Sequence, residues 1–185
     1  MTGRGILTFI AKVEDELTEL DQLKDRIQTV WGKYKTNSDE FYLDSVALNL
    51  HGLYSGFEKI FLEVAKEIDE NIPSGSSWHK ELLDQMALEI KNLRPAVISK
   101  DSRNILDEYR AFRHVVRNVY ANKYSAKKIA ILLEDFSPEY TRVKKEIQEF
   151  LRFLEADIDW SELYNLKKSN IFLESLLKSV KILYN

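Results

Sequence analysis

The chain has 185 residues, of which 44% are hydrophobic and 31% are charged, with 6 Gly, 3 Pro and no Cys. This length suits one domain with its own core, and the lack of cysteine excludes disulfides, cysteine–zinc sites and cysteine nucleophiles. The formal net charge of −3 excludes a surface that is basic throughout but leaves room for a local basic patch. Few Gly and Pro in a chain rich in Leu and charged residues favour long helices, so we expect an all-α fold.

Several classes of protein are excluded by what the sequence lacks. No apolar run approaches the roughly 18 residues that a membrane span needs, and the segment 1–6 is too polar and short for a signal-peptide core. We therefore expect a cytoplasmic protein with no membrane segment. The chain has neither a glycine-rich phosphate loop nor an HExxH helix, and no two of its 3 histidines have ligand spacing. We expect no metal and no cofactor.

Two long amphipathic helices are predicted at the start of the chain. From residue 5 to about 32, apolar residues recur every three or four positions, a spacing that lines one face of a helix. A polar turn follows, in which Ser38 is a suitable N-cap. The same apolar spacing then continues to about Glu70, which predicts a second long helix.

This second helix carries two glycines among several polar side chains. Gly52 and Gly56 lie four residues apart and would present one groove of small residues. The groove could admit a neighbouring helix, or it could belong to a polar lining with His51, Tyr54 and Glu58 that faces a site. We favour close packing, because a glycine costs a helix about 1 kcal/mol and packing is the usual reason for its presence.

Two further helices are expected in the middle of the chain. Ser77 can cap a helix over residues 77–90, in which we expect His79 to be a surface residue or to orient another group. After a loop that contains a proline, Asp101 or Ser102 can cap a helix that leads into the most basic part of the chain.

The remaining helices complete the predicted domain. Ser125 can cap a short helix, and Pro138 suits the first turn of the next one, whose apolar stripe ends near residue 154. Residues 157–185 interrupt this pattern and then show a new amphipathic stripe. We predict a helical bundle over residues 1–156 and an extra C-terminal helix, the C-terminal helical extension, over residues 157–185.

One stretch concentrates the residues that can do chemistry, from Tyr109 to Tyr124. It holds three arginines, a histidine, two asparagines and three tyrosines among apolar helix positions. From Asp101 to Lys128 there are seven basic and three acidic residues, a local charge of +4 in a protein whose net charge is −3. We expect any anion or nucleic-acid site to lie here.

The basic residues of this stretch share one face of a helix. Arg113, Arg117, Tyr120 and Tyr124 follow at offsets of four, three and four. Guanidinium groups gathered in this way need carboxylates between them or an anionic ligand, and tyrosines beside them offer stacking surfaces for single-stranded nucleic acid. The candidates for binding RNA or phosphate are Arg110, Arg117, Lys123 and Tyr124.

Two accounts of these arginines are open from their pattern alone. They could pair with Glu58, Glu63 or other carboxylates across the bundle, or they could hold the phosphate of a ligand. His114 lies on the same helix, and its imidazole could donate or accept a proton near neutral pH.

The chain resembles the HEPN superfamily, specifically its HepT-like branch. The motif of that branch is Arg, four residues, His, one residue and Tyr, and Arg113, Asn118 and Tyr120 stand at these three places. Two earlier segments are also similar to the branch, Tyr54–Phe61 and Trp78–Leu83.

The resemblance covers roughly residues 5–156 and implies an antiparallel helical bundle of the HEPN type that forms a homodimer. It implies a toxin that cuts RNA without metal, with the 2′-hydroxyl as nucleophile, at a dimer-interface site. The partner would be an MNT-type nucleotidyltransferase antitoxin that can adenylylate Tyr120. The candidate catalytic residues are Arg113, Asn118, Tyr120 and His114.

Asn118 departs from this motif, because an amide does not exchange a proton near pH 7. General acid–base help contributes roughly 10²–10⁴ to a rate, so three hypotheses follow. The protein is an RNA-cleaving toxin with altered chemistry, or a catalytically inactive HEPN module that binds RNA, nucleotide or a protein partner. The third hypothesis is a structural dimer whose arginines are paired internally.

Overall fold

The computed structural model describes residues 2–118, 124–156 and 158. This part of the chain contains helices and no strand, which confirms the all-α prediction. The helices are α1 (Gly3–Asn37), α2 (Glu40–Glu67), α3 (Trp78–Met86), α4 (Lys100–Asn118), α5 (Ala126–Leu132) and α6 (Phe136–Ala156).

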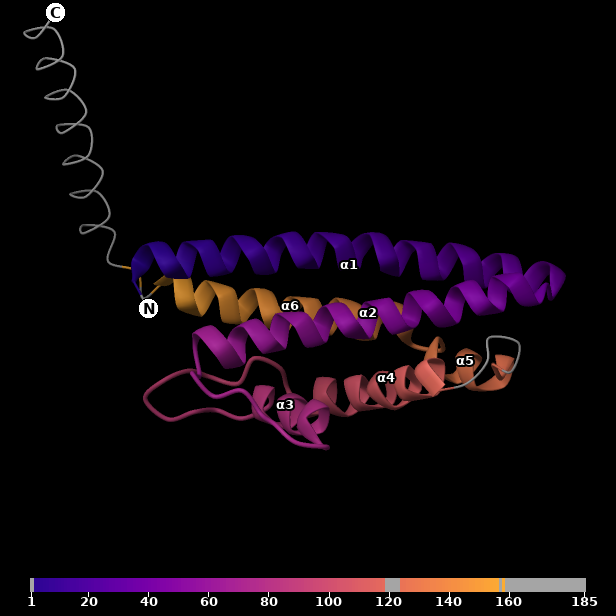
Figure 1. Cartoon of the computed structure of the whole chain (residues 1–185). Coiled ribbons are helices and arrows are strands. Elements are labelled where there is room, and N and C mark those ends of the chain that lie inside the picture. Colours follow the sequence, from indigo (N-terminus) through magenta and orange to yellow (C-terminus); the bar gives the residue numbers. More distant parts are fainter. Residues whose placement is uncertain (1, 119–123, 157, 159–185) are drawn as a thin grey trace, which may run out of the picture.

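The four long helices form an antiparallel bundle. In Figure 1, α2 lies between α1 on one side and α4 on the other, and α6 closes the bundle against α1 and α4. Successive long helices run in opposite directions, and the short helix α3 packs against α2 and α4. The predicted antiparallel helical bundle is therefore confirmed, and α4, which carries the basic stretch, lies beside α2 and α3.

The glycines of α2 allow α1 to approach closely. A Cβ atom on Gly56 would collide with the side chain of Leu20, and one on Gly52 would lie 3.6 Å from Cδ1 of Leu23. The favoured prediction, close helix packing, is confirmed at Gly56, whereas a Cβ at Gly52 would make an ordinary van der Waals contact. This face of α2 is turned to α1, which leaves the opposite side of the helix for α4.

The ends of two helices differ from the prediction. Ser38 does not cap α2: it ends α1 in the left-handed conformation, with φ 55°, and its N–H donates to the carbonyl of Tyr34. Asp39 caps α2 instead, because its carboxylate accepts from the N–H of Phe41 at 3.0 Å. Ser38 is needed for the sharp turn between the helices, so the next good capping residue takes over.

The end of α3 and the start of α4 also differ from the prediction. The helix predicted over residues 77–90 ends at Met86, after which the chain turns. Neither Asp101 nor Ser102 caps α4, because Ser99 does so: its hydroxyl accepts from the N–H of Ser102 at 3.1 Å. Ser125 does cap α5, by accepting from the N–H of Lys128, and its prediction is confirmed.

Arg94 holds the loop between α3 and α4. Its side chain is fully buried, and its Nε and one Nη donate to the two carboxylate oxygens of Asp69, at 2.5 and 2.7 Å. The other bonds go to the carbonyls of Leu88, Pro95 and Gln85. All five N–H groups of the guanidinium are therefore satisfied, and the loop is fixed to the end of α2.

Aromatic residues hold the other side of α4. The hydroxyl of Tyr109 donates to the carbonyl of Leu132 at 2.7 Å, and its ring packs near Phe136. Burial and the nearby carboxylate of Glu139 raise the pKa of Tyr109, so the phenol remains a hydrogen-bond donor. With this side anchored, the arginine face of α4 points to α2 and α3.

Among the residues that the structure describes, no helix combines the length and the apolar character that crossing a membrane requires. The predicted C-terminal extension lies outside the described residues apart from Ile158.

Candidate functional site

An open cavity of about 340 Å³ lies where α3 meets α4. Four residues of α4 line it, at offsets of three, one and three, which places them on one face of the helix. His79 of α3 completes the lining. The lining residues are His79, Arg110, Arg113, His114 and Arg117.

Arg113 is the innermost of the arginines in this cavity. Its Nη2 lies 3.3 Å from Oε1 of Glu58 on α2, and both side chains are largely buried. Of the two accounts left open by the sequence, pairing with a carboxylate holds for Arg113 and Glu58, whereas Glu63 pairs with Lys12 at 3.7 Å. The Nε of Arg113 is buried without a hydrogen-bond partner among the described residues, so one donor of this guanidinium is unused.

Glu58 also fixes His79. Its Oε2 lies 2.5 Å from Nδ1 of His79, and Nε2 of the same ring lies 3.4 Å from Nη1 of Arg113. Arginine can only donate hydrogen bonds, so Nε2 acts as the acceptor and the ring proton sits on Nδ1, directed at Glu58. The Trp78 ring lies against the imidazole, with 3.5 Å between ring centres, which limits the rotation of His79.

The other two arginines are less constrained. Arg110 donates through Nε to Asp107 of its own helix at 2.7 Å. Arg117 is exposed and pairs with no carboxylate of the described residues. The cavity therefore combines three guanidinium groups with two nearby carboxylates, Glu58 and Asp107, and an anion would find a favourable potential there.

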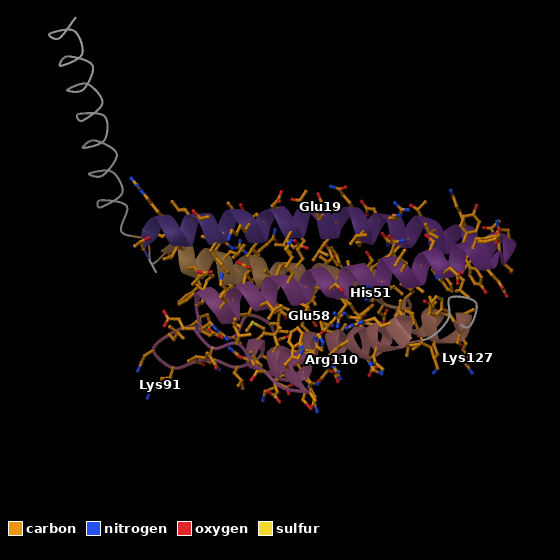
Figure 2. The ribbon with its side chains drawn as sticks, viewed as in Figure 1. Glu19, His51, Glu58, Lys91, Arg110 and Lys127 are labelled. Carbon is orange, nitrogen blue, oxygen red and sulfur yellow. The ribbon has the colours of Figure 1, made fainter. Side chains whose placement is uncertain are left out.

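His51 of α2 lies near the same arginines. Burial lowers its pKa, Arg113 and Arg117 lower it further, and Glu58 partly opposes them. Figure 2 shows His51 and Glu58 on α2 and Arg110 on α4 where these two helices face each other. Burial and the two guanidinium groups thus favour the neutral form of the imidazole.

The structure brings most of the predicted site residues together. Arg110, Arg113, His114 and Arg117 line one cavity, and Asn118 is the last residue of α4. Tyr124 does not line this cavity: it packs against the core, and burial and then Asp44 raise its pKa. Tyr120 and Lys123 lie outside the described residues.

His79 is the residue whose place in the site was not predicted, whereas Glu58 had been named as a possible partner of the arginines. His79 was expected at the surface or in an orienting role, but it lines the cavity and is 25% exposed. Both residues belong to the two segments that support the family resemblance, and that was the signal in the sequence. Among the described residues, no group of three His, Asp or Glu side chains could hold a metal ion.

A comparison with known protein families supports the resemblance that these two segments indicated. A family model described as HepT-like protein matches residues 45–154. The matched range contains α3 and α4 entirely, together with Glu58 and His51 of α2, so every described residue of the cavity falls inside it. No curated protein and no solved structure matches the chain.

Proposed function

Since the chain belongs to the HepT-like proteins of the HEPN superfamily, we propose that it is the toxin of a HEPN/MNT toxin–antitoxin pair and cleaves RNA without a metal ion. The observation that carries this proposal is the cavity of about 340 Å³ lined by three arginines and two histidines. Arginine clusters of this kind bind phosphate through charge-assisted, often bidentate hydrogen bonds.

In the proposed reaction, the arginines hold the phosphate of the cleaved bond. The guanidinium groups of Arg113 and Arg117, which both line the cavity, supply donors on two successive turns of α4. They would stabilise the negative charge that grows on the phosphate oxygens as the 2′-hydroxyl attacks. The size of the cavity is within the range of small-molecule sites, which suits part of one nucleotide.

The partners belong to the same proposal. We propose a cytoplasmic homodimer whose two motif segments, around Arg113, Asn118 and Tyr120, meet at the interface. An MNT-type nucleotidyltransferase would act as antitoxin by adenylylating Tyr120. The family resemblance supports these partners.

A second function is favoured by Asn118. The family motif has a histidine at this place, and an amide cannot replace its proton transfer. A HEPN module that binds RNA, nucleotide or a protein partner without cleavage would need the arginines and not the histidine.

Cleavage of tRNA and mRNA by the purified protein separates the two functions. We expect cleavage by the wild type, loss of cleavage in Arg113→Gln, and a rate increase in Asn118→His of up to about 10²-fold, since the restored imidazole can transfer protons. Product ends read by sequencing should carry a 2′,3′-cyclic phosphate.

Binding measured on the same RNA by fluorescence anisotropy provides the control. Lys145→Ala removes one exposed positive charge from α6 and should leave affinity unchanged within about twofold. Tight, salt-sensitive binding with no cleavage by the wild type would reject the ribonuclease proposal and establish the binding module.

A further inference from the structure

The proposed reaction needs a group that accepts the proton of the 2′-hydroxyl, and Asn118 cannot be that group. We propose that His79, oriented by Glu58, is the general base of RNA cleavage. This inference rests on the proposed function, and it adds a catalytic residue from α3 to a motif that lies on α4. Its basis is the Glu58–His79 pair and its place in the cavity, not the motif.

The Glu58–His79 pair has the geometry of an oriented base. Nδ1 of the imidazole donates to Oε2 of Glu58 at 2.5 Å, and the lone pair of Nε2 faces Nη1 of Arg113 at the wall of the cavity that both residues line. A carboxylate that holds Nδ1–H selects the tautomer and stabilises the ring once it has gained a proton. Glu58 is largely buried, so its charge acts in a medium of low polarity.

One carboxylate thus positions two functional groups. Oε1 of Glu58 faces Nη2 of Arg113 at 3.3 Å, and Oε2 faces His79. The phosphate-binding group and the base are therefore held at a fixed separation by a side chain on α2. The contact between His79 Nε2 and Arg113 Nη1, at 3.4 Å, is at the long end of a hydrogen bond, so a phosphate that attracts the guanidinium can replace it.

The step balances without any further reagent. The 2′-oxygen forms a bond to phosphorus, and the bond from phosphorus to the 5′-oxygen breaks, which yields a 2′,3′-cyclic phosphate. The proton of the 2′-hydroxyl moves to Nε2 of His79. The departing 5′-oxygen takes a proton from water at the open cavity, and the protonated ring returns its proton to the resulting hydroxide.

Replacing the base tests this assignment. In His79→Ala we expect kcat for cleavage of a short RNA to fall by about 10²–10⁴-fold, while the RNA affinity measured by anisotropy changes less than about threefold. Imidazole added to the buffer should restore part of the rate in His79→Ala and none in Arg113→Gln, because only the first variant lacks a proton acceptor. His79→Gln, which keeps a polar side chain, provides a second measurement if the alanine variant unfolds.

A second set of variants separates His79 from its neighbours. Glu58→Gln should lower kcat at least tenfold, and imidazole should not restore the rate, since the ring is present but poorly oriented. His114→Gln should lower kcat less than His79→Ala does. If kcat falls more in His114→Gln than in His79→Ala, and added imidazole restores it, then His114 is the general base and the inference is overturned.

The failure of this inference differs from the failure of the proposed function. If the wild type cleaves RNA and His79→Ala cleaves equally well, only the role of His79 is rejected. Loss of activity in His79→Ala that imidazole does not restore, with RNA affinity intact, would give His79 a structural role and reject the inference. If the wild type binds RNA and does not cleave it, the proposed function fails and the general base fails with it.

Discussion

Two arginine–carboxylate clusters link α2 to the parts of the chain that pack on it, and they differ in how completely they are satisfied. Arg94 is buried with Asp69, and each of its five N–H groups has an acceptor. Arg113 is paired with Glu58, but its buried Nε has no partner among the described residues. An open cavity with two more arginines adjoins Arg113, whereas protein atoms enclose Arg94.

The comparison distinguishes an arginine with a structural role from one that is available to bind a ligand. Removing a charge from water is unfavourable unless its hydrogen bonds are replaced. At Arg94 the protein supplies all of them and the loop between α3 and α4 becomes fixed. At Arg113 the protein supplies only some of them, and the guanidinium borders a cavity that is open to an anion.

The largest effect on stability is expected from Arg94→Met. This substitution leaves the carboxylate of Asp69 buried without its charged partner, although Gln85 still donates to it, and the free energy of unfolding should fall by about 3–5 kcal/mol. Urea unfolding followed by circular dichroism measures it. Lys145→Ala, which removes an exposed pair with Glu149, should change the free energy of unfolding by less than about 0.5 kcal/mol. Equal changes in the two variants would show that the Arg94 cluster is not structural.

An intermediate effect on stability and a larger one on binding are expected from Arg113→Gln. Glu58 keeps His79 as a partner, so the free energy of unfolding should fall by only about 1–2 kcal/mol. RNA affinity should fall about 10–100-fold at low salt. In a plot of log affinity against log salt concentration, the slope should decrease in magnitude by about one, because one phosphate contact is lost. A loss of stability as large as that of Arg94→Met, with unchanged affinity, would make Arg113 structural as well.

The smallest effect is expected at His51, and it reports on the charge of the cavity. Since burial, Arg113 and Arg117 lower its pKa, His51 should titrate below its ordinary value of 6.5 in NMR spectra. The unfolded chain then binds this proton more readily than the folded one, so the contribution of His51 to stability is present above pH 6.5 and decreases as the pH falls below it.

A substitution or a bound anion at the cavity should shift the pKa of His51. Arg113→Gln should raise the pKa of His51 towards 6.5, since one positive neighbour is gone, and so should inorganic phosphate bound to the wild type. Lys145→Ala should leave it unchanged. A His51 titration that responds to neither Arg113→Gln nor phosphate would place the anion site elsewhere.

Much of the fold was predictable from the sequence, because helix patterns are local. A repeat of three and four residues puts apolar side chains on one face wherever it occurs, and this spacing predicted the helices and the arginine face of α4. Capping was less predictable, as Ser38 and Ser99 show, because several suitable residues lie close together at each helix end and tertiary packing selects among them.

The candidate site was predictable only in part. The sequence alone determined that Arg110, Arg113, His114 and Arg117 share one face, since their spacing is a property of the helix. Only the tertiary structure decided that Glu58, and not Glu63, meets Arg113, and that His79 enters the same cavity. Those contacts join residues 21 to 55 positions apart, and their geometry depends on how α2, α3 and α4 pack, which no local pattern contains.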